Sequence, residues 1–349
     1  MSANTISKVT VWFGKNHSSF LPRLANSFLT VTGCSDGGFG AEICKKVVAA
    51  GHQLVATARN ISSLSYLPSN DPRILALALD VTSTEAIKSA FAAAIEKFGH
   101  VDVVVNNAGY SVSGDTEAIP DVDARKEFDT NFWGTVNVTK EAVRVFREVN
   151  GKGVGGLVVQ VTSLGGWVSF PGASFYHGRS ASILPSLSNI GAFINTSASK
   201  FAIEGFTESI SQEMPPDWNI KFLILEPGGM RTKFAAGSTK YVPAHPAYQN
   251  PSFPTRQLES FLQNAEVFNA VSADPGRTAD VVVNAILNQD KRPLPLRLAL
   301  GVAAYSMIKG KLAGMEKSMD EWKDVTNSTM SEEQIKIVMG MQAGPAASQ

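Results

Sequence analysis

Short runs of β-branched and other apolar residues alternate with helix-like stretches from Val31 onward, and this alternation constrains the fold more than any other feature. Several runs are almost continuously apolar, which is typical of strands covered on both faces. Strands are predicted at 53–58, 74–79, 101–106, 156–161 and 221–225, and helices at 41–50, 84–98, 125–149 and 200–214. Such strand–helix–strand units predict an α/β fold with a doubly wound parallel sheet.

Composition and charge narrow the class of protein. The 349 residues are 44% apolar and 18% charged, with 31 basic and 31 acidic side chains, so a large core is expected and no charge pattern favours nucleic acid or an anionic membrane. Cys34 and Cys44 have no metal-ligand spacing, so no metal site is predicted, and so few cysteines suggest a reducing, cytoplasmic compartment. A mitochondrial presequence is the alternative, because residues 1–35 carry basic and no acidic side chains.

One domain with an extension is expected. Residues 1–232 are predicted to form a Rossmann-type dinucleotide-binding and catalytic domain, and residues 233–349 a helical extension that covers the substrate side. The apolar stretch 298–308 is shorter than the roughly 20 residues of a membrane-spanning helix, so no span is predicted. Residues 341–349 are small and polar, which predicts a disordered end.

A glycine-rich stretch, TGCSDGGFG at 32–40, stands between a predicted strand and a predicted helix. Glycines there permit a tight turn and let the backbone approach a pyrophosphate at the helix N-terminus. Arg59 ends the next strand, where an acidic residue would bind a ribose 2′-hydroxyl; arginine suits a 2′-phosphate, so NADP(H) is favoured over NAD. The cofactor contacts predicted here are Gly33, Ser35, Gly38, Phe39, Gly40 and Arg59.

The catalytic residues predicted from the sequence form the pattern Ser163…Tyr176…Lys200. Thirteen residues separate Ser163 from Tyr176, and without residues 177–196 the text reads FYSASK, a Tyr-x-x-x-Lys spacing. With NNAG at 106–109 and PGGMRT at 227–232, the chain resembles the classical short-chain dehydrogenase/reductase family, in its fungal NADP-dependent form, over most of residues 31–232. Against that family's loop, Gly38 and Gly40 stand one residue late, so Asp36 or Gly37 is extra.

The resemblance implies an oxidoreductase that interconverts a ketone or aldehyde with an alcohol. Tyr176 would be the acid–base and Ser163 would bind the substrate oxygen, while Asn131 would position a water. Lys200 would hold the nicotinamide ribose and supply much of the about 4 kcal/mol that brings a phenol pKa from about 10 to about 7. The further cofactor contacts implied are Asp80, Val81, Asn107, Ala108, Gly109, Tyr176, Lys200, Pro227, Gly228, Met230 and Thr232.

The resemblance implies only a class of substrate and a kind of oligomer. Similar fungal reductases point to a small polyketide or terpenoid carbonyl of secondary metabolism, or to a lipid ketone. A homodimer or homotetramer through the helices that bear Asn131 and Lys200 is implied. Tyr305-x-x-x-Lys309 lies outside the family pattern and is interpreted as helix surface.

Two segments interrupt the motifs. Val9–Phe13 is interpreted as the first strand, residues 14–30 then separate it from the glycine loop, and residues 177–196 separate Tyr176 from Ser197. Both segments carry residues whose codons could spell intron signals, so we hypothesise that they are retained introns rather than real loops. The alternative in function is an NADP(H)-binding pseudoenzyme or regulator whose Tyr–Lys dyad is disrupted.

Overall fold

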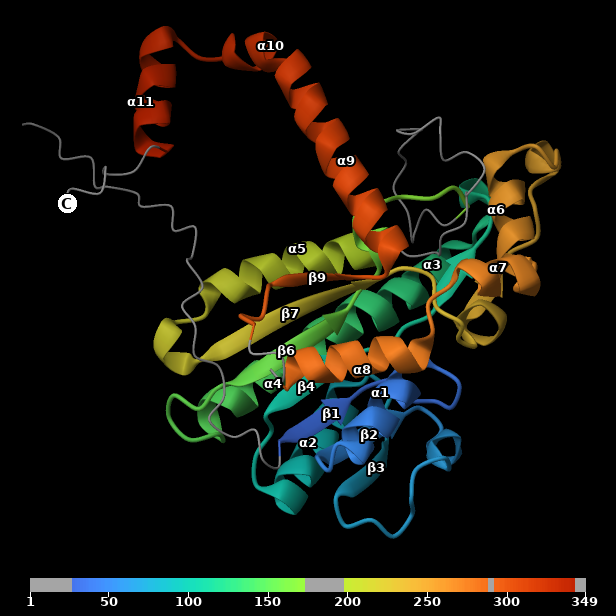
Figure 1. The fold of residues 1–349 in the computed structure, drawn as a ribbon, viewed down its shortest axis with the longest axis vertical. Helices are drawn as coiled ribbons and strands as arrows, with labels where there is room; N and C mark the ends of the chain where they lie inside the picture. The colour runs from blue at the N-terminus through green and yellow to red at the C-terminus, as the bar shows by residue number, and fades with distance from the viewer. Residues whose placement is uncertain (1–26, 173–197, 288–291, 343–349) are drawn as a thin grey trace, which may run out of the picture.

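A parallel β-sheet forms the centre of the molecule in the computed structural model, which describes residues 27–172, 198–287 and 292–342 (Figure 1). Its strands are β1 (Phe28–Val31), β2 (Gln53–Ala58), β3 (Ile74–Ala78), β4 (Val103–Asn106), β6 (Gly156–Val161), β7 (Ile220–Pro227) and β9 (Arg297–Leu300). Their order is β3-β2-β1-β4-β6-β7-β9. The chain thus winds outward from β1 in one direction and from β4 in the other, which confirms the predicted doubly wound sheet.

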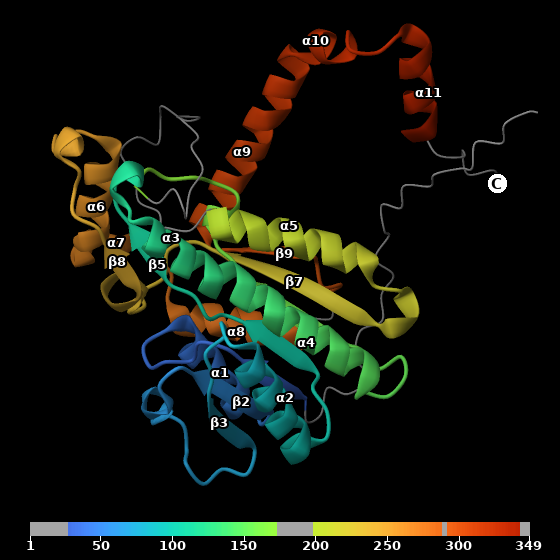
Figure 2. The same ribbon diagram turned by 180° about the vertical axis from the view of Figure 1, so that it is seen from behind.

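Helices cover both faces of this sheet. The face seen in Figure 2 carries α2 (Thr84–Phe98), α4 (Thr135–Glu148) and α5 (Ala198–Glu213). The face seen in Figure 1 carries α1 (Phe39–Ala49) and α8 (Pro275–Ile286). Each face has its own apolar core, with Phe91, Val138 and Ile210 on the first and Ile43 and Val282 on the second. Since both faces are buried, the strands are apolar almost without interruption.

Further elements gather at the carboxyl ends of the strands. They are the two-stranded sheet of β5 (Ser111–Ser113) and β8 (Thr239–Tyr241), the 3₁₀ turn η4 (Leu164–Gly166), and the helices α3 (Asp121–Phe128), α6 (Pro254–Gln263) and α7 (Ala265–Val271). The chain ends in α9 (Val302–Glu321), α10 (Lys323–Asn327) and α11 (Glu332–Gln342), which arch away from the body (Figure 1).

The first strand corrects an expectation from the sequence. The strand that leads into the glycine loop is β1, Phe28–Val31, and its register pairs Leu29 with Leu54 of β2 and with Val103 of β4. In the full chain, residues 28–30 are therefore buried strand residues. Residues 9–13 lie outside the described residues. Two apolar runs precede the loop, and only pairing with both neighbours distinguishes them.

One other expectation also needs correction. The single helix expected at 125–149 is α3, then a π-helical turn at Asp129–Gly134, then α4, because the buried Asn131 turns toward the backbone of Tyr110. The stretch 298–308, where no membrane span was predicted, is divided between β9 and α9 at Gly301, whose φ of 96° suits glycine. Helix α11 extends to Gln342, and residues 343–349 of the end predicted to be disordered lie outside the described residues.

Candidate active site

The glycine loop connects β1 to α1 and is held by close backbone packing. Gly33 has φ of 68°, and a Cβ on it would lie 2.6 Å from the Cα of Ala108. Gly40 packs against the side chain of Asn107, where an added Cβ would lie 2.5 Å from Nδ2. Both glycines are thus required by neighbouring atoms, and the loop can lie flat against the end of β4.

Hydrogen bonds join the glycine loop to the NNAG segment. The amide of Asn107 donates to the carbonyl oxygens of Thr32 and Gly33 at 3.0 and 2.9 Å. The backbone N–H groups of Asn107 and Ala108 both donate to the Thr32 hydroxyl oxygen at 3.0 Å. Asn106, in contrast, points into the core and donates to Thr139 and Gln160. The glycine loop and the NNAG segment therefore form one rigid wall.

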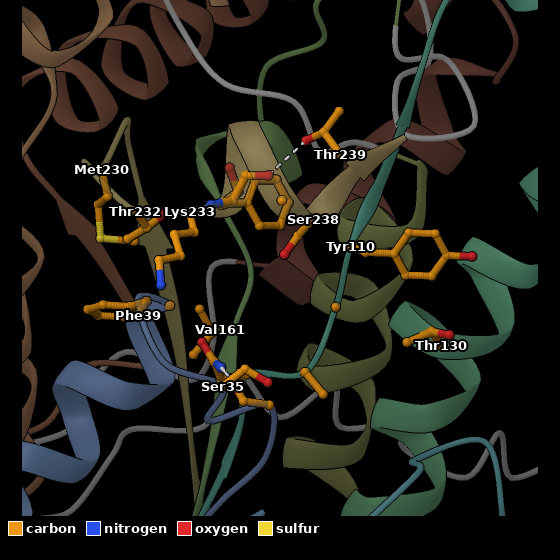
Figure 3. Close-up of a pocket in the computed structure, with 18 of the residues that line it drawn as sticks. Ser35, Phe39, Tyr110, Thr130, Val161, Met230, Thr232, Lys233, Ser238 and Thr239 are labelled. Carbon is orange, nitrogen blue, oxygen red and sulfur yellow. Dashed lines mark hydrogen bonds between the residues drawn. The ribbon is translucent and has the colours of Figure 1, made fainter. Parts of the chain in front are cut away.

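That wall borders a cavity of about 500 Å³ along the carboxyl ends of the strands. Figure 3 shows side chains from the glycine loop, β6 and residues 230–239 facing it. Of the site residues predicted from the sequence, those that line it are Gly33, Ser35, Gly38, Phe39, Arg59, Asp80, Val81, Asn107, Ala108, Gly109, Ser163, Lys200, Pro227, Gly228, Met230 and Thr232. Gly40 and Asn131 lie behind the lining, and Tyr176 lies outside the described residues.

One end of the cavity is lined by a basic side chain, Arg59. Arg59 follows β2 and is exposed at the cavity edge, and Asp80 and Val81 follow β3 beside it. The neighbouring loop is fixed, since Asp36 N donates to Ser63 O at 3.1 Å and the hydroxyl of Ser63 donates to that of Ser35 at the same distance. A cation stands here with hydroxyl groups nearby, the donor set that a phosphate monoester prefers.

The other end brings Lys200 and Ser163 to the same cavity. Lys200 lies in the first turn of α5 and donates from Nζ to the carbonyl oxygen of Val161, the last residue of β6, at 2.8 Å. The hydroxyl of Ser163 accepts from Gly165 N at 3.0 Å. Burial lowers the pKa of Lys200 to about 8, while the carboxylates of Glu127 and Glu204 favour its charged form.

Asn131 lies behind the lining in a buried hydrogen-bond network. Its Nδ2 donates to the carbonyl oxygen of Tyr110 at 2.8 Å, and its Oδ1 accepts from Tyr110 N at 3.0 Å. Nδ2 also lies 3.3 Å from the hydroxyl of Ser199, the residue before Lys200. The π-helical turn at Asp129–Gly134 places this side chain between the segment after β4 and the start of α5.

The network ends at Glu127, a residue that the sequence did not indicate. One carboxylate oxygen accepts from Val112 N at 2.9 Å, and the other lies 3.4 Å from Asn131 Nδ2. The side chain is almost fully buried, and this desolvation raises the pKa of Glu127 to about 8. In the sequence, Glu127 stands in the polar run DARKEF, which suggests a helix surface.

Several cavity residues had no sequence signal. Tyr110, Phe234, Leu262 and Phe268 add aromatic and apolar side chains to the cavity lining. They come from the segment after β4, the loop after β7, and helices α6 and α7. The pairing of β5 with β8 brings two of these segments together. No short motif spans such distances in the sequence, so only the fold identifies them.

The C-terminal extension supports the turn that carries Ser163. Leu164 in η4 packs against Ala304 and Ile308 of α9, and Lys311 of α9 donates a hydrogen bond to the carbonyl oxygen of Trp167. Tyr305 and Lys309 lie on the exposed side of α9, as the sequence predicted.

A buried ion cluster holds β9 against this region. Arg297 binds Glu204 of α5 and Glu226 of β7 at 2.5 and 2.6 Å, and its guanidinium lies 4.8 Å from the centre of the Trp167 ring. Burial raises the pKa of Glu204 to about 7, although Arg297 favours its ionised form. The edge strand thus connects to both α5 and the residues that follow Ser163.

Known proteins resemble this chain over most of its length. Residues 28–183 match the family model of short chain dehydrogenase, so the match begins in β1 and stops within the segment 177–196. The oxidoreductase calM of Penicillium decumbens is 40% identical over 311 residues, 88% of this chain and 94% of its own length. An uncharacterized oxidoreductase of Schizosaccharomyces pombe, C162.03, is 32% identical over 283 residues, covering 81% and 85% of the two chains.

A solved structure shares the architecture. The short-chain dehydrogenase of Streptomyces avermitilis has 31% sequence identity and a TM-score of 0.71, over 88% of this chain and 99% of its own. These relatives favour an oxidoreductase over the non-catalytic alternative. None of the helices within 27–172, 198–287 and 292–342 is long and apolar enough to cross a membrane.

Proposed function

The chain belongs to the short-chain dehydrogenase family, and on this premise we propose that it is an NADP(H)-dependent oxidoreductase that interconverts a ketone or aldehyde with an alcohol. One observation supports this proposal most. Arg59 stands at one end of a single cavity, and Lys200 and Ser163 stand at the other. A dinucleotide with a 2′-phosphate likewise carries this phosphate at its adenosine end and the reactive nicotinamide at its other end.

The residues present fit such a cofactor. The glycine loop precedes the N-terminus of α1, where backbone N–H groups and the helix dipole favour a pyrophosphate. Arg59 would hold the 2′-phosphate, Asp80 and Val81 the adenine, and Lys200 the nicotinamide ribose. Asn107, Ala108 and Gly109 would support it from β4, and Pro227, Gly228, Met230 and Thr232 from β7.

A bound nicotinamide would supply or accept the hydride, and side chains of the protein would transfer the proton to or from the substrate oxygen. We assign Tyr176 as the acid–base, Ser163 as the hydroxyl that binds the substrate oxygen, and Lys200 as the cation that lowers the pKa of the phenol. Lys200 is suited to this role because β6 fixes its ammonium group at the carbonyl of Val161. Asn131 ties the segment after β4 to the start of α5, and so positions Lys200.

The cavity favours an uncharged substrate with an apolar body. Tyr110, Phe234, Leu262 and Phe268 line the same cavity as Ser163 and Lys200. Lys240, also in the lining, is paired with Asp123 at 2.7 Å, so its charge is already balanced within the protein. A polyketide or terpenoid carbonyl, or a lipid ketone, fits this surface.

Assembly and compartment belong to the same proposal. Trp133 is 53% exposed and Phe201 is 36% exposed, on the π-helical turn before α4 and on α5, and exposed apolar side chains of this size suit a homodimer or homotetramer through these helices. Light scattering of the purified protein would measure the mass. We propose a cytoplasmic location, in keeping with the two buried, unpaired cysteines.

Turnover tests the activity. The purified chain is assayed for NADPH oxidation with a panel of apolar ketones and aldehydes, in parallel with Tyr176→Phe and Tyr305→Phe. Activity that Tyr176→Phe abolishes and Tyr305→Phe leaves intact supports the assignment, because Tyr305 is exposed on α9. Activity that survives Tyr176→Phe rejects Tyr176 as the acid–base. Binding of NADPH without turnover on any carbonyl, also after removal of 177–196, rejects the proposed activity.

A further inference from the structure

Asp36 and Lys233 form an ion pair at the part of the cavity where the pyrophosphate would lie. Asp36 is in the glycine loop, where either Asp36 or Gly37 makes this loop one residue longer than the family's pattern. Lys233 directly follows Thr232 in the segment after β7. Lys233 Nζ lies 3.1 Å from Asp36 Oδ2, and both residues line the cavity. In Figure 3 the amine of Lys233 points toward Phe39, the first residue of α1.

The backbone holds Lys233 in this place. Lys233 N donates to the carbonyl oxygen of Gly37 at 2.9 Å, and its side chain crosses Gly37 so closely that a Cβ there would lie 2.5 Å from Lys233 Cδ. On its other side the segment is fixed to residue 273, since Arg231 N donates to Ala273 O at 3.1 Å and Ala273 N to Gly229 O at 2.7 Å. The ammonium group therefore stays near the start of α1.

The carboxylate of Asp36 is unusual in an anion-binding loop, because a negative charge beside the N-terminus of α1 opposes a pyrophosphate. Lys233 neutralises it, and their hydrogen bond lowers the pKa of Asp36. The pair is weak, however, since the Lys233 and Asp36 side chains are 68% and 55% exposed, and water and salt screen an exposed ion pair. A hydrogen bond to the doubly charged pyrophosphate is stronger than one to a single exposed carboxylate. The comparison favours phosphate over Asp36 as the partner of Lys233.

We propose that Lys233 is a ligand of the cofactor pyrophosphate, and that Asp36 holds Lys233 at the mouth of the site until the cofactor binds. This inference rests on the proposed function, because it requires a dinucleotide in this cavity. It extends that function by assigning one residue that binds the cofactor, Lys233, and one residue that competes with the cofactor for Lys233, Asp36.

Equilibrium binding tests the proposal without turnover. NADPH and NADH are titrated into the full chain and into Lys233→Met, Asp36→Asn and the double variant, with nucleotide fluorescence as the readout. Because the pyrophosphate is common to both nucleotides, Lys233→Met should weaken both by about tenfold, close to 1.4 kcal/mol. Asp36→Asn should tighten both by about twofold to fivefold, since a competitor for the ammonium is removed. Most of that gain should vanish in the double variant.

Lys46→Met is the matched control. Lys46 of α1 forms a comparable exposed pair with Asp280 of α8 at 2.8 Å, and Lys46 does not line the cavity. This variant should bind as the unchanged chain does. The proposal is overturned if Lys233→Met binds within about twofold of the unchanged chain, or if Asp36→Asn weakens binding as Lys233→Met does. A chain that binds NADH alone rejects the NADP(H) preference and still decides the role of Lys233. A chain that binds neither nucleotide rejects both proposals.

Discussion

Asn131 and Tyr110 form a closed pair of hydrogen bonds, in which the side-chain amide of one satisfies both backbone groups of the other at 2.8 and 3.0 Å. The pair connects the π-helical turn before α4 to the segment after β4, and Asn131 is fully buried. Its first consequence is structural, because a side chain without an amide leaves the partly buried N–H and carbonyl of Tyr110 without this partner.

Asn131→Ala should lower the free energy of unfolding by about 1–3 kcal/mol, the cost of leaving two partly buried backbone groups without their partner. Urea denaturation followed by circular dichroism measures this. The control is Asn269→Ala, since Asn269 is exposed on α7 and its loss should leave the unfolding midpoint unchanged. Equal midpoints for the two variants would show that the pair does not stabilise the fold.

Glu127→Gln should change how stability depends on pH. Burial raises the pKa of Glu127 to about 8, above the value of about 4.5 in an unfolded chain, so its contribution is fully present below about pH 4.5 and is lost as pH rises toward 8. Between pH 5.5 and 8.5 the unchanged chain should therefore lose on the order of 2–3 kcal/mol relative to Glu127→Gln.

Denaturant titrations at several pH values measure this difference. Glu85→Gln is the control, because Glu85 is exposed and its pKa is lowered by hydrogen bonds, so it is ionised throughout this range. A constant difference between Glu127→Gln and the unchanged chain from pH 5.5 to 8.5 would contradict the assigned ionisation of Glu127.

Arg59→Ala should alter the choice of nucleotide. If Arg59 binds the 2′-phosphate, its removal weakens NADPH by about tenfold to a hundredfold, the value of one charge-assisted contact, and leaves NADH within about twofold. Arg73→Ala is the control, since Arg73 pairs with Asp71 at 2.6 Å before β3 and does not line the cavity. An equal loss for the two nucleotides would place Arg59 away from the 2′-phosphate.

A chain without residues 177–196 should reduce carbonyls faster than the full chain. The deletion returns the Tyr176–Lys200 separation from 24 residues to four, the spacing of one helical turn. A misplacement of about 1 Å costs on the order of a hundredfold in rate, so the gain in kcat should be of that size. The same kcat in both chains would show that the segment does not disturb the dyad.

The same hypothesis concerns the native protein. If 14–30 and 177–196 are retained introns, peptides of the native protein join residue 13 to 31 and 176 to 197, and none contains SLSNIGAF. Phe13 would then replace Thr30 in β1, where the buried Thr30 hydroxyl has no hydrogen-bond partner in the described part of the chain. A native SLSNIGAF peptide would refute the hypothesis for 177–196.

The sequence predicted the elements whose signal is local. The strands at 53–58 and 156–161 agree with β2 and β6, because strands buried on both faces are continuous apolar runs. Most motif residues of the glycine loop and residues 107–109 of the NNAG segment line one cavity, because parallel strands end at one edge of the sheet.

What the sequence missed depends on contacts between distant segments. Glu127 is buried only because Val112 and Asn131 lie over it, and Lys233 approaches Asp36 across 197 positions of the chain. The first strand was misplaced because two apolar runs precede the glycine loop, and pairing decides which one enters the sheet. Strand β9 is four residues long at the sheet edge, too short for periodicity to detect.

The packing of α9 beneath the turn of Ser163 separates two properties that are often modified together. Residues 33–109 and 227–233 form the proposed nucleotide side, whereas Ala304 and Ile308 pack against Leu164 and Lys311 donates to the carbonyl oxygen of Trp167, both in the segment after β6. Substitutions at Ile308 and Lys311 should therefore alter which carbonyl compounds are accepted before they alter nucleotide affinity. Closely related chains could accept different carbonyl compounds through changes in the C-terminal helix while binding the same nucleotide.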